Sequence, residues 1–341
     1  MIGANASSGY LRIATFLFLL ALIPGLPSGA QERPRIRISV ENYPGHVQTE
    51  AVRRFSEELE RVLGDRFDVD FYDSGRLFRD RDVLQALSGG NVEIAVPGTW
   101  QIDRYERSVA VFLLPAFFGR SPEFVHRMSD GALGSEINRR MQQSLNAVVL
   151  GRWLDLGHAH LYFTNQSVHS HDELRGLRIR VAGGLGNELR IEKLGGEPVI
   201  VPWNDLPYFL ERRRVDGVLT THETVRSGEL WAYGVDYSLE DYQYFAQYVP
   251  LMRRTFWNRL SAEDRSAVMA AWESIVNRQR EHAARAQNEA RAILQAQGIE
   301  IQRATDRDIE DTRRRLLRDQ DEMARVLGVP PVVVRLLENQ Q

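Results

Sequence analysis

Two arginines on one predicted strand are the residues of this chain best suited to bind an anion. The segment Leu177–Val181 alternates polar and apolar side chains, which places Arg178 and Arg180 on one face. At the carboxyl end of a strand in an open α/β sheet, a side chain points into the crevice where ligands bind. A guanidinium there offers a planar fork that matches a carboxylate. Arg180 is therefore a candidate carboxylate clamp; the alternative is a surface arginine in a salt bridge.

A glycine-rich turn follows this strand and opens the helix predicted over 187–194. The turn, Gly183–Gly186, is not a G-x-G-x-x-G fingerprint, and Trp203 stands where an acidic ribose partner would be expected. A dinucleotide site is therefore disfavoured. Main-chain N–H groups at the start of a helix can still hold an anion.

Two H-x-H pairs are the strongest hint of a metal site. Residues i and i+2 of a strand share a face, so His158/His160 and His169/His171 could each offer two imidazoles to one ion. The alternative is one ligand-lining histidine together with solvated loop histidines. His222-Glu223 begins a zincin motif, but Arg226 occupies the position of its second histidine. We predict no resident metal.

Composition excludes several functions. The chain has no cysteine, which rules out a thiolate metal site, a Cys nucleophile and a disulfide scaffold. No G-x-S-x-G elbow and no S-x-x-K motif in an apt context is present. The formal net charge of −3 gives no reason to expect binding to nucleic acid or to an anionic membrane.

Strands alternate with helices in two blocks, before and after about residue 155, which favours two α/β lobes with largely parallel sheets. We predict strands over 35–40, 67–71, 92–96, 177–181, 198–201 and 215–219, and helices over 49–64, 83–87, 187–194 and 206–214. The expected lobes are 31–155 with about 246–275, and 156–245 with about 276–341.

One helix is predicted to be unusually long. Ser261 caps it, with Asp264 as a capping-box partner, and Gly298 ends it some 36 residues later, about 54 Å at 1.5 Å per residue. A helix of this length could run along both lobes as a brace. A coiled coil is the alternative, but its apolar seam is mostly alanine.

The first thirty residues are predicted to be a signal peptide. Arg12 precedes the apolar run 13–23, and Ser28-Gly29-Ala30 supplies small residues for cleavage. The run is shorter than the ~20 residues that span a bilayer. The mature protein, starting near Gln31, is expected to be exported and soluble; an uncleaved anchor is the alternative.

The stretch 172–217 resembles the signature of TRAP transporter solute-binding proteins, the DctP-like family. The similar parts are D-E-L-R-G-L-R-I-R-V at 172–181, the glycine turn, L-G-G-E-P-V at 194–199, Pro202-Trp203 and R-V-D-G at 214–217. The resemblance extends over nearly the whole mature chain. It implies the type II periplasmic-binding-protein fold, with two α/β lobes, crossing strands and a long bracing helix.

The resemblance also implies a ligand site between the lobes. Arg180 would clamp the ligand carboxylate, and Trp203 would pack against the ligand. Thr220 replaces an asparagine that commonly contacts the ligand, and His160 with Ala159 stands where a second arginine is frequent. Four further residues complete the expected site: Asn42, Thr99 and Trp100, after the first and third strands, and Glu223, after the strand predicted over 215–219.

The predicted function is capture of a small organic acid for delivery to the small and large membrane subunits of a TRAP transporter in the periplasm. No cofactor is predicted, although a divalent cation could bridge protein and carboxylate. The alternatives are a periplasmic sensory receptor and, on the same fold, an organic-acid enzyme with Glu223 or His160 as general base.

Overall fold

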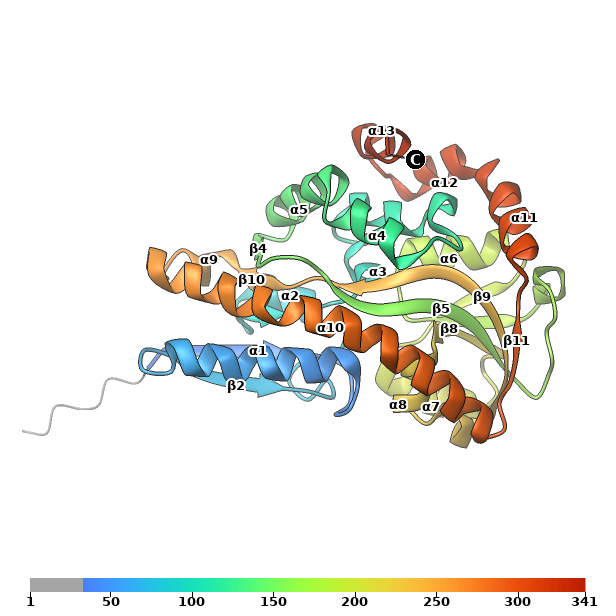
Figure 1. Ribbon diagram of the computed structural model, residues 1–341, viewed down its shortest axis with the longest axis horizontal. Helices are drawn as coiled ribbons and strands as arrows, with labels where there is room; N and C mark the ends of the chain where they lie inside the picture. Colours follow the sequence, from blue (N-terminus) through green and yellow to red (C-terminus); the bar gives the residue numbers. More distant parts are fainter. Residues whose placement is uncertain (1–32, 341) are drawn as a thin grey trace, which may run out of the picture. The chain divides into compact units, whose positions relative to one another are not determined.

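The computed structural model describes residues 33–340, and from Pro34 onward they form one compact unit with two β-sheets (Figure 1). The first sheet has the order β2-β1-β3-β10-β4 and defines lobe I; the second has the order β11-β9-β5-β8-β6-β7 and defines lobe II. The strands are β1 Arg35–Ser39, β2 Asp68–Tyr72, β3 Ile94–Ala95, β4 Ala147–Val149, β5 Leu154–Thr164, β6 Arg178–Val181, β7 Glu197–Ile200, β8 Gly217–Thr221, β9 Val235–Tyr248, β10 Leu251–Arg253 and β11 Glu300–Arg303.

Helices surround both sheets. They are α1 Val47–Leu63, α2 Val83–Gly89, α3 Thr99–Ile102, α4 Pro122–Ser129, α5 Ala132–Ser144, α6 Leu185–Lys193, α7 Leu206–Glu211, α8 His222–Ser227, α9 Arg254–Trp257, α10 Ala262–Ala296, α11 Asp306–Leu317, α12 Gln320–Leu327 and α13 Pro331–Glu338. Every predicted strand and helix has a counterpart, with ends that shift by a few residues. Helix α1 begins at Val47, before the predicted Thr49, because the His46 imidazole accepts a hydrogen bond from the main-chain N–H of Gln48 and caps it.

Two of the chain's crossings between the lobes adjoin the two longest strands. The chain passes from lobe I to lobe II between β4 and β5, and it returns between β9 and β10. Strands β5 and β9 are the longest and pair antiparallel with each other, and β5 also pairs antiparallel with β8. The expectation of largely parallel sheets is therefore corrected: β5 and β9 make the second sheet mixed, and β10, antiparallel to β3 and β4, makes the first sheet mixed.

Helix α10 has 35 residues and contacts α1 of lobe I as well as α8 and β5 of lobe II (Figure 1). Its length is about 52 Å at 1.5 Å per residue. Trp272 anchors it to α1 by an edge contact with Phe55, with ring centroids 5.0 Å apart. Ser261 accepts a hydrogen bond from the main-chain nitrogen of Asp264, as expected of the cap. The Asp264 carboxylate pairs instead with Arg66 at 2.9 Å, so the predicted capping box is incomplete.

The C-terminal helices were not foreseen. Buried side chains of α12 and α13 join the hydrophobic core built by the segment 83–153 of lobe I; they include Met323, Leu327, Val333 and Leu337. Residues 320–338 therefore pack on lobe I, whereas the sequence assigned them to the second lobe. The remaining lobe boundaries stay a prediction.

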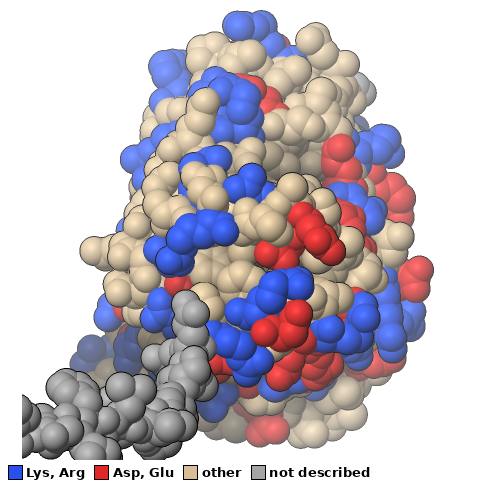
Figure 2. All heavy atoms as spheres, turned by 90° about the vertical axis from the view of Figure 1, so that its left-hand side faces the viewer, with Lys and Arg blue, Asp and Glu red and all other residues tan. Residues whose placement is uncertain are grey.

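Among the described helices, none combines the length and apolar character needed to cross a bilayer, α10 included. The face shown in Figure 2 carries basic and acidic side chains interspersed with each other. The predicted signal peptide, 1–30, lies outside the described residues.

Candidate ligand-binding site between the lobes

A cavity of about 40 Å³ lies where the two sheets meet. Its volume is enough for only a few water molecules, so the lobes are in a closed arrangement. Residues from both lobes and from the crossing strands line it: Glu41, Asn42, Asp80, Trp100, Gln101, Leu156, Arg180, Ala182, Trp203, Leu219, Thr220, Thr221, Thr224, Tyr244, Ala246 and Tyr248.

Arg180 lies on β6 with only 2% of its surface exposed. Its Nε donates to the carbonyl of Val201 at 2.9 Å, while its Nη2 has no hydrogen-bond partner. Among the described residues, no carboxylate forms an ion pair with it. Burial lowers the pKa of Arg180 to about 10, so the guanidinium remains charged at neutral pH. A buried, charged donor without a partner is costly, and an anion in the cavity would satisfy it.

Two tryptophans supply further donors. The Nε1 atoms of Trp100 and Trp203 are buried and lack a hydrogen-bond partner. Together with Arg180 Nη2, they are the unpaired buried side-chain atoms of the described cavity lining. All three are N–H donors. Such a set matches a ligand rich in acceptor oxygens, as a carboxylate is.

Trp203 is held in place from several sides. Its main-chain nitrogen donates to Asp80 Oδ2 at 3.0 Å, and its ring lies 5.9 Å from that of Tyr43. The Arg180 guanidinium lies 5.9 Å from the indole centroid, within cation–π range. The indole therefore also orients the guanidinium.

Two carboxyl groups of lobe I also border the cavity. Glu41 follows β1, and Asp80 precedes α2. Burial, reinforced by Asp80, raises the pKa of Glu41 to about 8, so Glu41 is mainly protonated at neutral pH. Burial also raises the pKa of Asp80, against two main-chain N–H groups that favour its charged form: those of Trp203 and Arg81.

Five of the eight residues predicted for the site line the cavity: Arg180, Trp203, Thr220, Asn42 and Trp100. Thr220 lies opposite His160 in the β5–β8 pairing, so strand alternation turns its side chain away from the face of Leu219 and Thr221. Thr221 also lines the cavity, and its hydroxyl caps α8 by accepting a hydrogen bond from the main-chain nitrogen of Thr224 at 3.2 Å. Thr99 is buried in the first turn of α3 but is not part of the cavity lining.

His160 and Glu223 also lie away from the cavity lining. His160 borders a separate pocket of about 450 Å³ beside α10, and Glu223 is buried at the start of α8. The general base that the enzyme alternative required is thus not at the cavity.

Sequence reasoning missed Glu41, Asp80, Tyr244 and Tyr248. Glu41 could have been found, because it directly precedes Asn42 after the first strand. Asp80 lies within Arg79–Asp82, a charged run typical of a solvated loop, so no sequence signal marked it. Tyr244 and Tyr248 belong to β9, which the sequence analysis did not identify as a strand.

Comparison with known proteins gives the family. The model of the bacterial extracellular solute-binding protein family 7, DctP, matches residues 38–325. The chain belongs to this family. It is 22% identical over 254 residues to the C4-dicarboxylate-binding periplasmic protein DctP of Shewanella loihica, covering 73% of each chain. It is 19% identical over 266 residues to the sialic acid-binding periplasmic protein SiaP of Vibrio cholerae, covering 78% of this chain and 82% of that one.

Solved structures of TRAP solute-binding proteins have the same fold. A sugar acid binding protein of Advenella mimigardefordensis, in complex with galactonate, superposes with a TM-score of 0.83 at 17% identity, over 91% of this chain and 99% of that one. A protein of Sulfurospirillum deleyianum with bound succinate gives 0.82 at 16% identity, with the same coverages. The predicted type II fold is confirmed. As a TRAP solute-binding protein, the chain binds a solute and is not an enzyme.

The glycine turn of this solute-binding protein joins the lobes. The main-chain nitrogen of Gly186 donates to Asp103 Oδ2 at 3.0 Å. A Cβ on Gly184, whose φ is +86°, would lie 2.3 Å from the carbonyl oxygen of Trp100. The start of α6 therefore holds an anion, as the sequence suggested, but that anion is a side chain of lobe I. Glycine at 184 permits the close approach of the two lobes.

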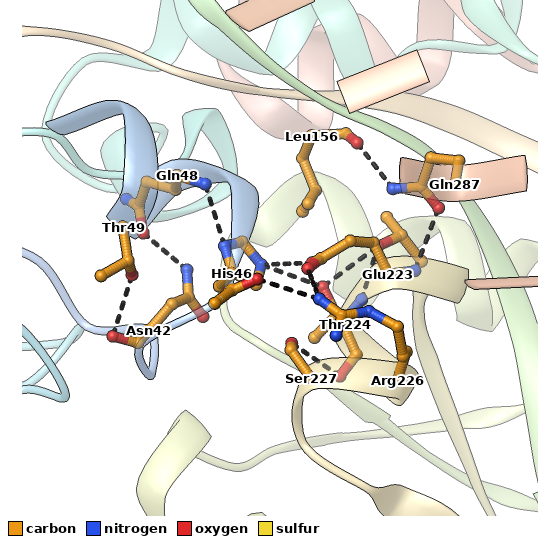
Figure 3. A network of polar contacts seen from close by, with 12 residues as sticks. Asn42, His46, Gln48, Thr49, Leu156, Glu223, Thr224, Arg226, Ser227 and Gln287 are labelled. Carbon is orange, nitrogen blue, oxygen red and sulfur yellow. Dashed lines mark hydrogen bonds and ion pairs between the residues drawn. The ribbon is translucent and has the colours of Figure 1, made fainter. Parts of the chain in front are cut away.

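A second contact between the lobes belongs to the polar network of Figure 3, which also includes Asn42 and Thr224 of the cavity lining. His46 Nε2, at the start of α1, lies 3.0 Å from Glu223 Oε2 on α8, and neither side chain is exposed. Arg226 donates to Glu223 Oε1 at 2.8 Å and to the carbonyl of Gly45 at 2.9 Å. Burial lowers the pKa of His46 to about 3 and raises that of Glu223 to about 7. Glu223 is thus a contact between the lobes in the closed form.

One histidine cluster has ligand atoms close enough to share a metal ion. They belong to His160, His222 and Glu240, all buried, and lie within 4.8 Å of one another. However, His160 Nδ1 accepts the main-chain N–H of Tyr242 at 3.1 Å, so the neutral ring carries its proton on Nε2. Arg291 already pairs with Glu240 at 2.9 Å. We therefore assign no metal here, and the absence of a resident metal stays a prediction.

Proposed function

We propose that this solute-binding protein captures a small organic acid in the cavity between the lobes, with the Arg180 guanidinium clamping its carboxylate. The observation that carries the proposal is the unpaired, buried Nη2 of Arg180, with two indole N–H donors in the same cavity lining. A charge-assisted hydrogen bond of this kind contributes roughly 1.5–3 kcal/mol. The lobes must separate to admit the ligand, because the closed cavity is small, and then close over it.

The relatives support an acidic ligand. Their printed names include a C4-dicarboxylate-binding and a sialic acid-binding protein, and the solved structures contain galactonate and succinate. We place this protein in the periplasm on the same basis. There it would deliver the acid to the small and large integral membrane subunits of a TRAP transporter.

Calorimetric titration with a panel of organic acids tests the clamp. Arg180→Ala should weaken binding of the acid that wild type binds by at least about tenfold. Arg178→Ala is the matched control: Arg178 lies two residues away on the same strand but is partly exposed and pairs with Asp216. Full affinity in Arg180→Ala would refute the clamp. We propose no cofactor, so chelation with EDTA should leave the affinity unchanged; a loss would reveal a bridging divalent cation.

Delivery to membrane subunits needs a separate measurement. Proteoliposomes that contain the two membrane subunits should accumulate the labelled acid only when this protein is added. Arg180→Ala should fail to support uptake at a concentration where Arg178→Ala does. Uptake that is independent of the added protein would contradict the proposed partnership.

A further inference from the structure

The cavity lining contains more carboxyl groups than cationic side chains, and this imbalance discriminates among acids. The cavity lining contains one cationic side chain, Arg180, and two carboxyl groups, Glu41 and Asp80. Arg180 belongs to β6 of lobe II, whereas both carboxyl groups belong to lobe I. A ligand carboxylate held by Arg180 therefore leaves the rest of the ligand to meet carboxyl groups when the lobes close.

A second carboxylate on the ligand would find no second cation in this lining. Asp80 accepts two main-chain hydrogen bonds, at 3.0 and 2.8 Å, which favour its charged form. Like charges repel strongly in a cavity shielded from water. A diacid would therefore have to bind protons, or force a proton onto Asp80 and keep Glu41 protonated, as the lobes close.

Hydroxyl groups suit the same surroundings. A hydroxyl donates one hydrogen bond and accepts others, and the cavity lining contains further side chains that also donate and accept: Asn42, Thr221, Thr224 and Tyr248. Glu41, whose pKa is raised to about 8 by burial, can both donate and accept in its protonated form. The four aromatic residues of the lining, Trp100, Trp203, Tyr244 and Tyr248, supply apolar walls for the carbon chain.

We propose that the ligand is a hydroxylated monocarboxylate, and that Glu41 and Asp80 make the site reject dicarboxylates. This inference rests on the proposed function, because it takes the Arg180–carboxylate contact as given. It assigns the lobe I carboxyl groups the role of receiving the ligand hydroxyls.

Matched pairs of acids test the inference by calorimetry on the wild-type protein. D-gluconate and D-glucarate differ by a terminal hydroxymethyl in place of a carboxylate, and glycerate and tartronate form the same pair at shorter length. Within at least one pair the monoacid should bind, and its diacid should bind at least about tenfold more weakly. Hexanoate and propionate, which lack the hydroxyls, should bind at least about tenfold more weakly than their hydroxylated counterparts.

The ligand class and the Arg180 clamp can be refuted by different results. A diacid that binds as tightly as its monoacid, or a deoxy acid that does, would overturn this inference and leave the Arg180 clamp standing. No binding of any carboxylate would overturn the proposed function and this inference together.

Two variants locate the selectivity. Asp80→Asn should reduce the ratio of monoacid to diacid affinity, because it removes a negative charge that opposes the diacid. Glu41→Gln should reduce the ratio above about pH 8, where the Glu41 carboxyl is ionised. Glu57→Gln, at an exposed position on α1, should leave the ratio unchanged. An unchanged ratio in both cavity variants would overturn the role of the carboxyl groups. The wild-type comparison of acids decides the ligand class even where a variant fails to fold.

Discussion

The carboxylate of Asp103, in lobe I, accepts a hydrogen bond of 3.0 Å from the main-chain nitrogen of Gly186, in the first turn of α6 in lobe II. The contact closes the molecule without touching the cavity lining. It combines a charge-assisted hydrogen bond with the positive end of a helix dipole. Burial raises the pKa of Asp103 to about 6, so it is mainly ionised at neutral pH.

Asp103→Asn should therefore weaken ligand binding by about tenfold, because it removes roughly 1.5 kcal/mol from the closed form, which holds the ligand. Calorimetry gives the affinity, and small-angle X-ray scattering should show a larger radius of gyration at subsaturating ligand. Asp65→Asn, at an exposed position, is the control. Equal affinities for Asp103→Asn and wild type would show that this contact does not stabilise closure.

His46 and Glu223 should contribute to closure in the same way. His46 Nδ1 accepts a hydrogen bond from Gln48, so the neutral ring carries its proton on Nε2, which donates to Thr224 Oγ1 at 3.4 Å and lies 3.0 Å from Glu223 Oε2. His46→Asn keeps an acceptor that can cap α1 but is too short to keep the contact with Glu223. We expect its affinity for the ligand to fall by about tenfold, because the closed form loses the hydrogen bond from His46 Nε2 to Thr224 Oγ1 and the adjacent contact with Glu223. His282→Asn, on α10 and partly exposed, should bind the ligand as wild type does. A similar loss of affinity in that variant would show that the loss in His46→Asn does not come from the contact between the lobes.

The sequence predicted the parts of the fold that are marked by a regular spacing of apolar residues or by a helix cap. Arg180 was found because β6 alternates strictly, and α10 because Ser261 and Gly298 bound a continuous helical pattern. The crossing strand β9 was missed because its buried face includes Ser238, Glu240 and Gln247, which look like solvated residues. They are buried because their partners are distant in sequence: Gln247 donates to Asp155, and Glu240 pairs with Arg291. Such pairings cannot be read from local periodicity.

The same limit applies to the site. Arg180 and Trp203 follow from local pattern and resemblance, and the structure places both in the cavity lining. His160 of β5 pairs with Thr220 of β8, and alternation along β8 places Thr220 on the face opposite Leu219 and Thr221. Only the pairing of the two strands gives this register. Asp80 lies in a loop and is buried at the cavity, but its charged sequence neighbours are typical of an exposed loop, so the sequence gives no sign of this burial.

Gly228 should control the position of Trp203 without lining the cavity. A Cβ at residue 228 would lie 2.7 and 2.9 Å from two atoms of the Trp203 indole, so the ring would have to move. Gly228→Ala should therefore lower ligand affinity by about tenfold, through the displaced indole and the guanidinium that packs over it. Gly89→Ala, in α2, adds the same methyl group with its nearest neighbour atom, Asn91 Nδ2, at 3.4 Å and serves as the control. Quenching of tryptophan fluorescence by acrylamide reports on ring exposure, and unchanged quenching with unchanged affinity would contradict the prediction.

Glu41 should make the stability of the ligand-free protein fall as the pH rises. Its pKa is about 8 in the folded protein against 4.5 as the ordinary value, so between these pH values the folded state binds more protons than the unfolded state. The stabilising proton is fully present below about pH 4.5 and is lost as the pH rises through about 8, at up to about 1.4 kcal/mol per pH unit. His46, with its pKa lowered to about 3, acts in the opposite direction only below about pH 6.5. Urea unfolding between pH 6.5 and 8 therefore avoids the His46 effect. Glu223, with its pKa raised to about 7, adds to the slope below about pH 7, so the comparison with Glu41→Gln isolates the part due to Glu41. Glu41→Gln should flatten this slope and Glu57→Gln should not; parallel slopes for wild type and Glu41→Gln would show that Glu41 does not carry the bound proton.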